Sequence, residues 1–354
     1  MTILGSTGSI GINALKVARE QNLQVEALSA NSNFELLNKQ IEEFHPKYVC
    51  IGKKELKDRV AHNRVFVGED AMLDMLELCE SSVVLNALVG FSGLKPTIKT
   101  LELGKNLALA NKESLVVAGS FIDSSKITPV DSEHFSVSCL LEKKPKKIIL
   151  TASGGAFRDT DLEALKSVSV EQALKHPNWN MGKKITVDSA TMTNKLFELL
   201  EAKWLFGAQK YDAVIEKTSK VHALVQFYDG SMSAHISHSD MKLPITYALV
   251  EGFDGEVLED VELFDLELRF LPIKASRYPI WEIKDDLLNN PSRGVIINAA
   301  NDIAVELFLE KKISFLDISK TALKCYKRYL NAKIESIDDV FAIDREVKDF
   351  LTRS

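Results

Sequence analysis

Three acidic side chains in two segments of the chain are of the type that binds a hard metal ion. In the segment 129–134 (PVDSEH), Asp131 and Glu133 alternate, so both point the same way if the segment is extended. Glu198 is a third candidate ligand. Carboxylate oxygens favour Mg²⁺ or Mn²⁺, with Co²⁺ as a further candidate, over softer metals. The alternative for Asp131 and Glu133 alone is a solvated acidic turn.

Glu198 shares a predicted helical face with an amide and a cation. Asn194 and Lys195 precede it by four and three residues in a helix-like run, 187–198, and residues at these spacings lie on one side of a helix. A carboxylate, an amide and an ammonium group presented together can hold a metal ion beside an anionic substrate. The alternative is an ordinary Lys–Glu pair on a helix surface.

Two glycine-containing segments could bind phosphate groups. The segment 5–11 (GSTGSIG) follows a predicted strand and opens a predicted helix, an arrangement that brings backbone N–H groups to a dinucleotide pyrophosphate. Its spacing is GxxGxxG rather than GxGxxG, and the alternative is a glycine turn that binds nothing. The segment 151–155 (TASGG) can form a phosphate nest from Ser153 and backbone N–H groups.

The segment 176–182 (HPNWNMG) has the composition of a mobile lid. Trp179 and Met181 can cover an apolar face of a substrate, and Gly182 can serve as a hinge. His176 fits either a ligand contact or the end of a helix.

The residues after the second predicted strand, 29–33 (SANSN), would select between NAD and NADP. Folds that use NAD place an acid there for the ribose 2′-hydroxyl, and this segment contains none, although Glu35 is close. Neutral donors without a carboxylate favour NADP. The segment also contains no Arg or Lys that could bind the 2′-phosphate.

Short β-rich runs alternate with helical patterns in residues 2–130, which predicts an α/β fold with a Rossmann-like, doubly wound parallel sheet. The last predicted strand leads into 109–114 (LANKES), at the carboxyl edge where such sheets bind ligands; a polar junction is the alternative. The predicted strands are 2–4, 25–28, 48–51, 83–87 and 106–110, and the predicted helices are about 11–20, 34–44, 70–79 and 93–104.

The pattern changes near residue 130. A strand is predicted at 148–150, and alternating runs at 223–228 and 231–236 around an Asp-Gly pair predict a hairpin. Helices predicted at 295–311, 316–330 and 337–351 would form a small C-terminal helical domain. We therefore expect an NADPH-binding domain at 1–130, a central α+β catalytic domain at 131–255, a linker at 256–290 and the helical domain at 291–354.

Composition excludes other classes of protein. A chain of 354 residues predicts two or three domains at roughly 100–200 residues each. The net charge of -6 offers no overall positive field to nucleic acid or an anionic membrane. The four cysteines form no CxxC pair, and neither a signal peptide nor an apolar run of roughly 18 residues is found. We expect a cytoplasmic protein without nucleic-acid or membrane partners.

Several segments, in order along essentially the whole chain, resemble the 1-deoxy-D-xylulose 5-phosphate reductoisomerase family. The resemblance is carried by 5–11 (GSTGSIG), 109–116 (LANKESLV), 129–134 (PVDSEH), 153–158 (SGGAFR), 176–182 (HPNWNMG), 187–195 (VDSATMTNK) and 298–302 (NAAND).

The resemblance implies roles for individual residues. A divalent metal would be bound by Asp131, Glu133 and Glu198, which with Lys112 and His176 would form the catalytic set. Ser132 and Lys112 would lie near the reacting oxygens of the substrate, and Trp179 and Met181 would belong to the lid. The substrate phosphate would be bound by Ser153, His176, Ser189, Asn194 and Lys195, and NADPH by Thr7, Gly8, Ser9, Ile10, Ala30, Asn31, Ser32, Asn33, Asn111, Glu113 and Gly182.

Two positions depart from the family pattern. Leu196 and Phe197 stand where the family commonly has Gly and Leu, which would only repack a helix. The residues 31–33 are Asn-Ser-Asn where the family often has Gly-Lys-Asn, which concerns the contact to the 2′-phosphate.

The resemblance implies an NADPH- and metal-dependent rearrangement and reduction of a phosphorylated sugar, 1-deoxy-D-xylulose 5-phosphate, to 2-C-methyl-D-erythritol 4-phosphate. It also implies a homodimer, formed through the hairpin region. One alternative is another NAD(P)-dependent oxidoreductase, of the homoserine or semialdehyde dehydrogenase type, which needs no metal. A non-enzymatic NADP-binding protein would not need three separated carboxylates, and a pure metal-dependent isomerase is disfavoured by the N-terminal dinucleotide fold.

Overall fold

The computed structural model describes residues 1–264 and 266–353, and the chain divides into two compact units. Position 265, in the predicted linker, and position 354, at the end of the predicted helical domain, lie outside the described residues. The sequence-based division at 130, 255 and 290 stays a prediction. The first unit comprises Met1–Ser114, Asp123–Phe135 and Asp240–Glu259, and the second comprises Leu115–Ile122, Ser136–Ser239 and Asp260–Ser354.

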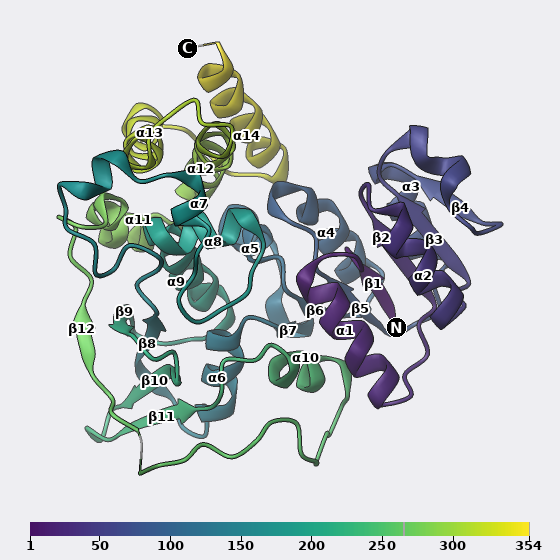
Figure 1. The fold of residues 1–354 in the computed structure, drawn as a ribbon, viewed down its shortest axis with the longest axis horizontal. Coiled ribbons are helices and arrows are strands. Elements are labelled where there is room, and N and C mark those ends of the chain that lie inside the picture. The colour runs from purple at the N-terminus through teal and green to yellow at the C-terminus, as the bar shows by residue number, and fades with distance from the viewer. Residues whose placement is uncertain (265, 354) are drawn as a thin grey trace. The chain divides into compact units, whose positions relative to one another are not determined.

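A seven-stranded, fully parallel sheet forms the first unit, in the order β4-β3-β2-β1-β5-β6-β7. This confirms the predicted doubly wound sheet (Figure 1). The strand order reverses between β1 and β5, and such a reversal opens a crevice at the carboxyl ends of the two strands. The strands are β1 (Thr2–Leu4), β2 (Ala27–Ala30), β3 (Tyr48–Ile51), β4 (Val65–Val67), β5 (Val83–Asn86), β6 (Asn106–Leu109) and β7 (Ile127–Pro129).

Helices cover both faces of this sheet. On one face, α1 (Ser9–Glu20), α2 (Phe34–Phe44) and α10 (Lys242–Leu249) pack apolar side chains onto the strands. On the other face, α3 (Glu69–Leu78) does so and also contacts α4 (Leu94–Glu102). The predicted helices are confirmed. The sequence analysis missed β4 and β7 because each has only three residues, too few for a period-two pattern.

A five-stranded mixed sheet organises the second unit, in the order β11-β10-β8-β9-β12. The pair β8–β9 is parallel and the other pairs are antiparallel. The predicted hairpin is confirmed, with Gly230 at φ +88° in the turn between β10 and β11. The strands are β8 (Pro145–Ala152), β9 (Lys210–Glu216), β10 (Val221–Phe227), β11 (Met232–Ile236) and β12 (Phe270–Pro272).

Three helices at the C-terminal end of the second unit confirm the predicted helical segments. They are α12 (Gly294–Leu309), α13 (Phe315–Arg328) and α14 (Ile337–Thr352), and α12 contacts both of the others (Figure 1). Apolar residues of α12 and α13 share a core with Val187 and Ala190.

The remaining helices are α5 (Lys112–Ala118), α6 (Ser132–Leu140), α7 (Val170–Ala173), α8 (Lys183–Thr191), α9 (Thr193–Leu205) and α11 (Lys284–Asn289).

None of the described helices combines the length and the apolar character that a bilayer span demands.

Candidate active site

The glycine turn 5–11 lies at the switch point of the first sheet, beside the end of β5. Gly5 has φ +83°, and a Cβ there would stand 2.6 Å from the Ala87 carbonyl oxygen. A Cβ on Gly11 would stand 2.4 Å from the Gly5 carbonyl oxygen. Both positions therefore require glycine, and the chain turns tightly into α1. The predicted cofactor residues Thr7, Gly8, Ser9 and Ile10 lie on this turn and at the N-terminus of α1, whose first turn carries no acidic residue.

Gln40 of α2 fixes this turn, and the sequence analysis did not identify it. Ser6 Oγ donates to Gln40 Oε1 (2.7 Å), and Gln40 Nε2 donates back to the Ser6 carbonyl oxygen (2.9 Å). Gln40 is only 5% exposed. The available signal was a polar residue on the apolar face of α2, between Leu37 and Ile41.

The segment 31–33 follows β2, after buried Ala30, and is exposed. Asn33 is the N-cap of α2, because its Oδ1 accepts the Leu36 N–H (3.1 Å). The Lys53 N–H donates to the Asn31 carbonyl oxygen (3.1 Å), so the end of β3 lies beside this segment.

Arg59 supplies a cation close to this segment. It ends a short 3-10 helix, Lys54–Arg59, and its guanidinium Cζ lies 3.9 Å from the centre of the Phe34 ring, next to Asn33. The sequence analysis found no Arg or Lys within 29–33. The cation is 25 residues or more away along the chain, and only the parallel pairing of β2 with β3 brings it near.

Asn111 is committed to protein partners rather than to solvent. Its Nδ2 donates to the carbonyl oxygens of Leu88 and Gly90 (2.9 Å each), and its Oδ1 accepts the Ser114 N–H (3.2 Å). Asn111 is 1% exposed. It therefore clamps the loops after β5 and β6 together, beside Glu113, whose carboxylate it also contacts.

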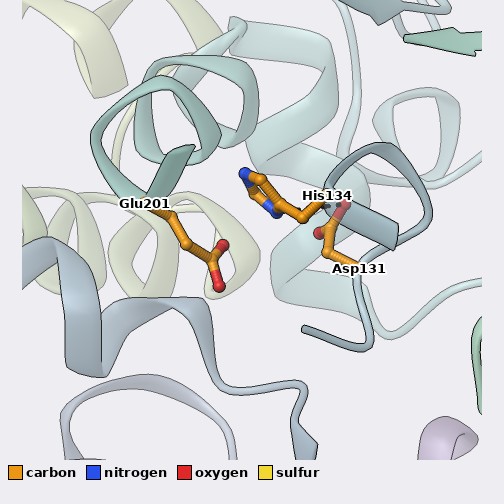
Figure 2. A group of neighbouring side chains, drawn as sticks. All are labelled: Asp131, His134 and Glu201. Carbon is orange, nitrogen blue, oxygen red and sulfur yellow. Dashed lines mark ion pairs between the residues drawn. The ribbon is translucent and has the colours of Figure 1, made fainter. Parts of the chain in front are cut away.

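Lys112 and Asp131 form a buried ion pair within the first unit. Lys112 is 6% exposed, and its ammonium group needs the carboxylate because an unpaired buried charge is strongly unfavourable. His134 Nδ1 lies 3.9 Å from Asp131 Oδ1 (Figure 2). Asp131 thus stands between two nitrogen groups, and His134 was not identified from the sequence as a site residue.

The segment 129–134 is not extended as the alternation argument assumed. β7 ends at Pro129 and α6 begins at Ser132. Asp131 starts the helix, because its carbonyl oxygen accepts the Phe135 N–H (2.9 Å) and its Oδ1 accepts the Glu133 N–H (3.3 Å). An acid before a helix caps free N–H groups, and this preference prevailed over a strand. Ser132 Oγ also donates to Glu133 Oε2 (2.5 Å).

Glu198 in the second unit confirms the shared face predicted on α9. Asn194 Nδ2 donates to Glu198 Oε1 (2.5 Å), and Lys195 Nζ pairs with Glu198 Oε2. Lys195 is 3% and Glu198 1% exposed, so the pair is not a surface pair. The run 187–198 is broken into α8 and α9 at Met192, which has φ +71°. Glu201, also drawn in Figure 2, lies further along α9 and is 1% exposed.

Ser153 and His176 meet directly in the second unit. The Nδ1 of His176 accepts the N–H groups of Asn178 (3.2 Å) and Trp179 (2.9 Å), so the ring proton is on Nε2, which lies 2.8 Å from Ser153 Oγ. Ser153 Oγ also accepts the Gly155 N–H (3.1 Å). With two donors already on the oxygen, the Ser153 hydroxyl proton is directed toward a further acceptor.

Gly154 and Gly155 follow with φ +86° and +70° and form a tight turn, the Ser153 nest, in which the Gly155 N–H donates to Ser153 Oγ. A Cβ on Gly155 would stand 2.5 Å from Ala190 Cα and 2.7 Å from the Ser189 carbonyl oxygen. The nest is therefore packed against the C-terminal turn of α8, and Ser189 is brought beside it.

The segment 176–182 is attached to the turn between β9 and β10. Asn178 Nδ2 donates to the Lys217 carbonyl oxygen (2.9 Å) and to Ser219 Oγ (2.6 Å). The Trp179 ring packs edge-on to His222, at 6.1 Å between ring centres. Met181 is half-buried, and a Cβ on exposed Gly182 would meet no atom within 4 Å among the described residues.

The predicted site residues thus form local groups. The metal-ligand candidates Asp131 and Glu133 belong to the first unit and Glu198 to the second. The predicted NADPH residues lie in the first unit except Gly182, and the predicted phosphate residues all lie in the second.

Three family models match successive parts of the chain. Residues 1–119 match the model described as 1-deoxy-D-xylulose 5-phosphate reductoisomerase, and 127–206 and 236–350 match two models of its C-terminal domain. The chain belongs to the 1-deoxy-D-xylulose 5-phosphate reductoisomerase family.

Relatives and solved structures match over nearly the whole length. The reductoisomerase of Campylobacter hominis is 54% identical over 99% of this chain and 98% of its own, and that of Nautilia profundicola is 52% identical over 98% of each. A reductoisomerase crystal structure in complex with NADPH, fosmidomycin and magnesium has a TM-score of 0.92 at 30% identity, over 99% of this chain and 97% of that one. The Zymomonas mobilis enzyme in complex with NADPH has a TM-score of 0.88 at 35% identity, over 98% and 96%.

The ionisation of His176 gives a testable pH dependence. Burial, with a smaller contribution from the Arg158 guanidinium, lowers the pKa of His176 to about 4. Above its unfolded pKa of about 6.5, His176 is neutral in both states and contributes no pH dependence. Between these values the unfolded chain binds a proton that the folded chain does not, so stability falls as the pH falls.

We expect the free energy of unfolding to fall more steeply between pH 7 and pH 5 for the parent protein than for His176→Asn. Urea denaturation at both pH values measures this difference. Equal pH dependence in the two proteins would show that His176 is not held neutral by its surroundings.

Proposed function

We propose that this chain converts 1-deoxy-D-xylulose 5-phosphate to 2-C-methyl-D-erythritol 4-phosphate, using NADPH and a divalent metal ion. The observation that carries the proposal is the family match along the whole chain. It is supported by the crystallised relatives, one of which binds NADPH and magnesium. The glycine turn at the sheet's switch point suits a dinucleotide, because tight backbone approach and a helix N-terminus favour its pyrophosphate.

The metal would be held by Asp131, Glu133 and Glu198. All three offer carboxylate oxygens, the donors that Mg²⁺ or Mn²⁺ prefers and that Co²⁺ also accepts. Glu198 is buried with Lys195 and Asn194 as its partners, so both of its carboxylate oxygens are held in place inside the protein. When bound, such an ion polarises the substrate carbonyl and stabilises negative charge on its oxygen.

Lys112 and Ser132 would act beside these carboxylates. The Lys112 ammonium group is already oriented by Asp131, and Ser132 Oγ by Glu133. The Lys112 ammonium group can donate a hydrogen bond to a reacting oxygen of the substrate, whereas Ser132 Oγ, whose proton goes to Glu133, can accept one from a substrate hydroxyl. Holding them in place before the substrate binds lowers the reorganisation needed in the transition state.

The substrate phosphate would be held by Ser153, His176, Ser189, Asn194 and Lys195. The Ser153 hydroxyl, oriented by His176 and the Gly155 N–H, supplies a neutral donor, and Lys195 supplies charge. Phosphate contacts far from the reacting carbons fix the orientation of the substrate. Trp179 and Met181 would cover it when the segment 176–182 closes.

We also propose the division of labour expected from the sequence, with 1–130 for NADPH, 131–255 for catalysis, 256–290 as linker and 291–354 as helical domain. A homodimer through the hairpin region is supported by the edge strand β11, whose first residue Met232 is 50% exposed, and by Tyr228 in the turn before it, which is 56% exposed. An exposed, apolar strand edge invites pairing with another chain. Sedimentation velocity tests this, and a monomer at micromolar concentration would contradict it. A cytoplasmic location stays a prediction.

A coupled assay tests the proposed function directly. We expect NADPH absorbance to fall when 1-deoxy-D-xylulose 5-phosphate and Mg²⁺ are both present, and EDTA to abolish the reaction. A metal-free oxidoreductase of the homoserine or semialdehyde dehydrogenase type would instead keep its activity in EDTA.

Glu198→Gln tests the metal assignment. The substitution keeps the size of the side chain but removes its charge, so we expect kcat to fall by about 10³-fold or more, as for removal of a metal ligand or charge-stabilising group. NADPH binding, followed by cofactor fluorescence, should change little because the predicted cofactor residues near 5–11 and 31–33 are untouched. Turnover near the parent rate would refute the assignment.

Arg59→Leu tests the origin of NADPH preference. We propose that Arg59 binds the 2′-phosphate in place of the basic residue that 31–33 lack. The variant should lose about tenfold in NADPH affinity, the scale of a charge-assisted contact, with NADH affinity unchanged. Arg64→Leu, which removes a different exposed arginine of the same unit, is the control. An equal loss for both cofactors would contradict this role.

A further inference from the structure

The segment 298–302 (NAAND) on α12 has no role in the site as described so far. Asn298 and Asn301 are both fully buried in the second unit. Burying an amide is energetically unfavourable unless the amide makes hydrogen bonds inside the protein. Asn301 makes such a bond, because its Nδ2 donates to Asp188 Oδ1 on α8 (2.7 Å).

Asp188 is a buried carboxylate with a partner on each oxygen. It is 3% exposed, and its Oδ2 accepts from Lys184 Nζ, one turn earlier on α8 (2.8 Å). Lys184 Nζ also lies 3.3 Å from Asp302 Oδ1 on α12. α8 is therefore joined to α12 by a buried hydrogen bond and by a partly exposed ion pair. A hydrogen bond to a carboxylate is directional and stronger than one between neutral groups.

The residue after Asp188 is Ser189, a predicted phosphate ligand. The backbone at Ser189 and Ala190 lies directly against Gly155, at distances that leave no room for a Cβ. A rotation or shift of α8 would therefore change the distance between Ser189 and the Ser153 nest. The Asp188–Asn301 hydrogen bond is the directional contact to α12 at this point of α8, beside the apolar packing of Val187 and Ala190.

We propose that Asn301 is a positioning residue for the substrate phosphate. Its amide holds Asp188, and through Asp188 it holds Ser189 at the correct distance from Ser153. This inference rests on the proposed function, because it takes Ser189 and Ser153 as phosphate ligands. It gives the NAAND segment of the C-terminal helices a task in substrate binding without any contact to substrate.

Asn301→Leu tests the proposal, since leucine has nearly the shape of asparagine but cannot donate to Asp188. We expect KM for 1-deoxy-D-xylulose 5-phosphate, and the inhibition constant of inorganic phosphate, to rise about tenfold, the scale of one charge-assisted hydrogen bond. kcat at saturation and the dissociation constant for NADPH should stay within about twofold.

A reciprocal exchange separates positioning from a general loss of packing. In the double variant Asp188→Asn with Asn301→Asp, donor and acceptor change places and the hydrogen bond can form again. We expect it to restore KM toward the parent value, whereas Asn301→Asp alone sets two carboxylates against each other. The control is Asp212→Asn on β9, a partly buried acid of the same unit that pairs with Lys147 and Lys284. It should lower stability to urea without changing KM.

The outcomes distinguish this inference from the function on which it rests. If Ser189→Ala raises KM and Asn301→Leu does not, the phosphate site stands and the positioning role is wrong. If neither variant changes KM, the phosphate assignment fails and the inference fails with it. If Asn301→Leu raises KM but the exchanged pair does not recover, or if Asp212→Asn raises KM equally, the effect is loss of packing and the proposal is overturned. If Asn301→Leu does not fold, the double variant is compared with the parent protein. A KM about tenfold higher in the double variant than in the parent would then overturn the proposal.

Discussion

A buried charge must have a partner of opposite charge, and this constraint orders most of the candidate site. Lys112 pairs with Asp131 in the first unit, and Lys195 with Glu198 and Lys184 with Asp188 in the second. Breaking any one pair would leave an uncompensated charge in the interior, which is far more costly than the pair itself is stabilising. Each pair therefore fixes the position of a side chain that the chemistry needs, or of the helix that carries one.

Local donors, rather than overall charge, make the anion sites. The chain is net negative, yet its proposed ligands carry several phosphate groups. Backbone N–H groups contribute at both sites: Gly5 and Gly11 allow the turn into the N-terminus of α1, and the Gly155 N–H orients Ser153 Oγ. Because these donors are backbone N–H groups, they can contribute to an anion site without adding a positively charged side chain.

Neighbouring protein groups orient the side chains and turns that would contact the ligands. Gln40 fixes the Ser6 turn, Asn111 clamps two loops at the sheet edge, and backbone N–H groups fix the tautomer of His176. Of these orienting groups, only those of His176 lie close in sequence to the group that they orient. Sequence motifs identify the groups that do chemistry more readily than the groups that orient them, since orientation depends on contacts between distant segments.

The sequence by itself determined five of the seven strands of the first sheet, the hairpin and the C-terminal helices, because apolar periodicity and turn residues are local properties of the chain. It also predicted that Asn194, Lys195 and Glu198 share one helical face, because that spacing follows from helix geometry alone. The roles of individual metal, phosphate and cofactor residues came from the family resemblance and stay predictions. Only the tertiary structure decided that Asp131 caps α6 instead of lying in a strand, and that Met192 divides α8 from α9. It also decided that Arg59 lies beside 31–33 and that Asn301 holds Asp188. These arrangements depend on which distant segments pack together and on which polar groups they bury. A local sequence pattern does not contain this information.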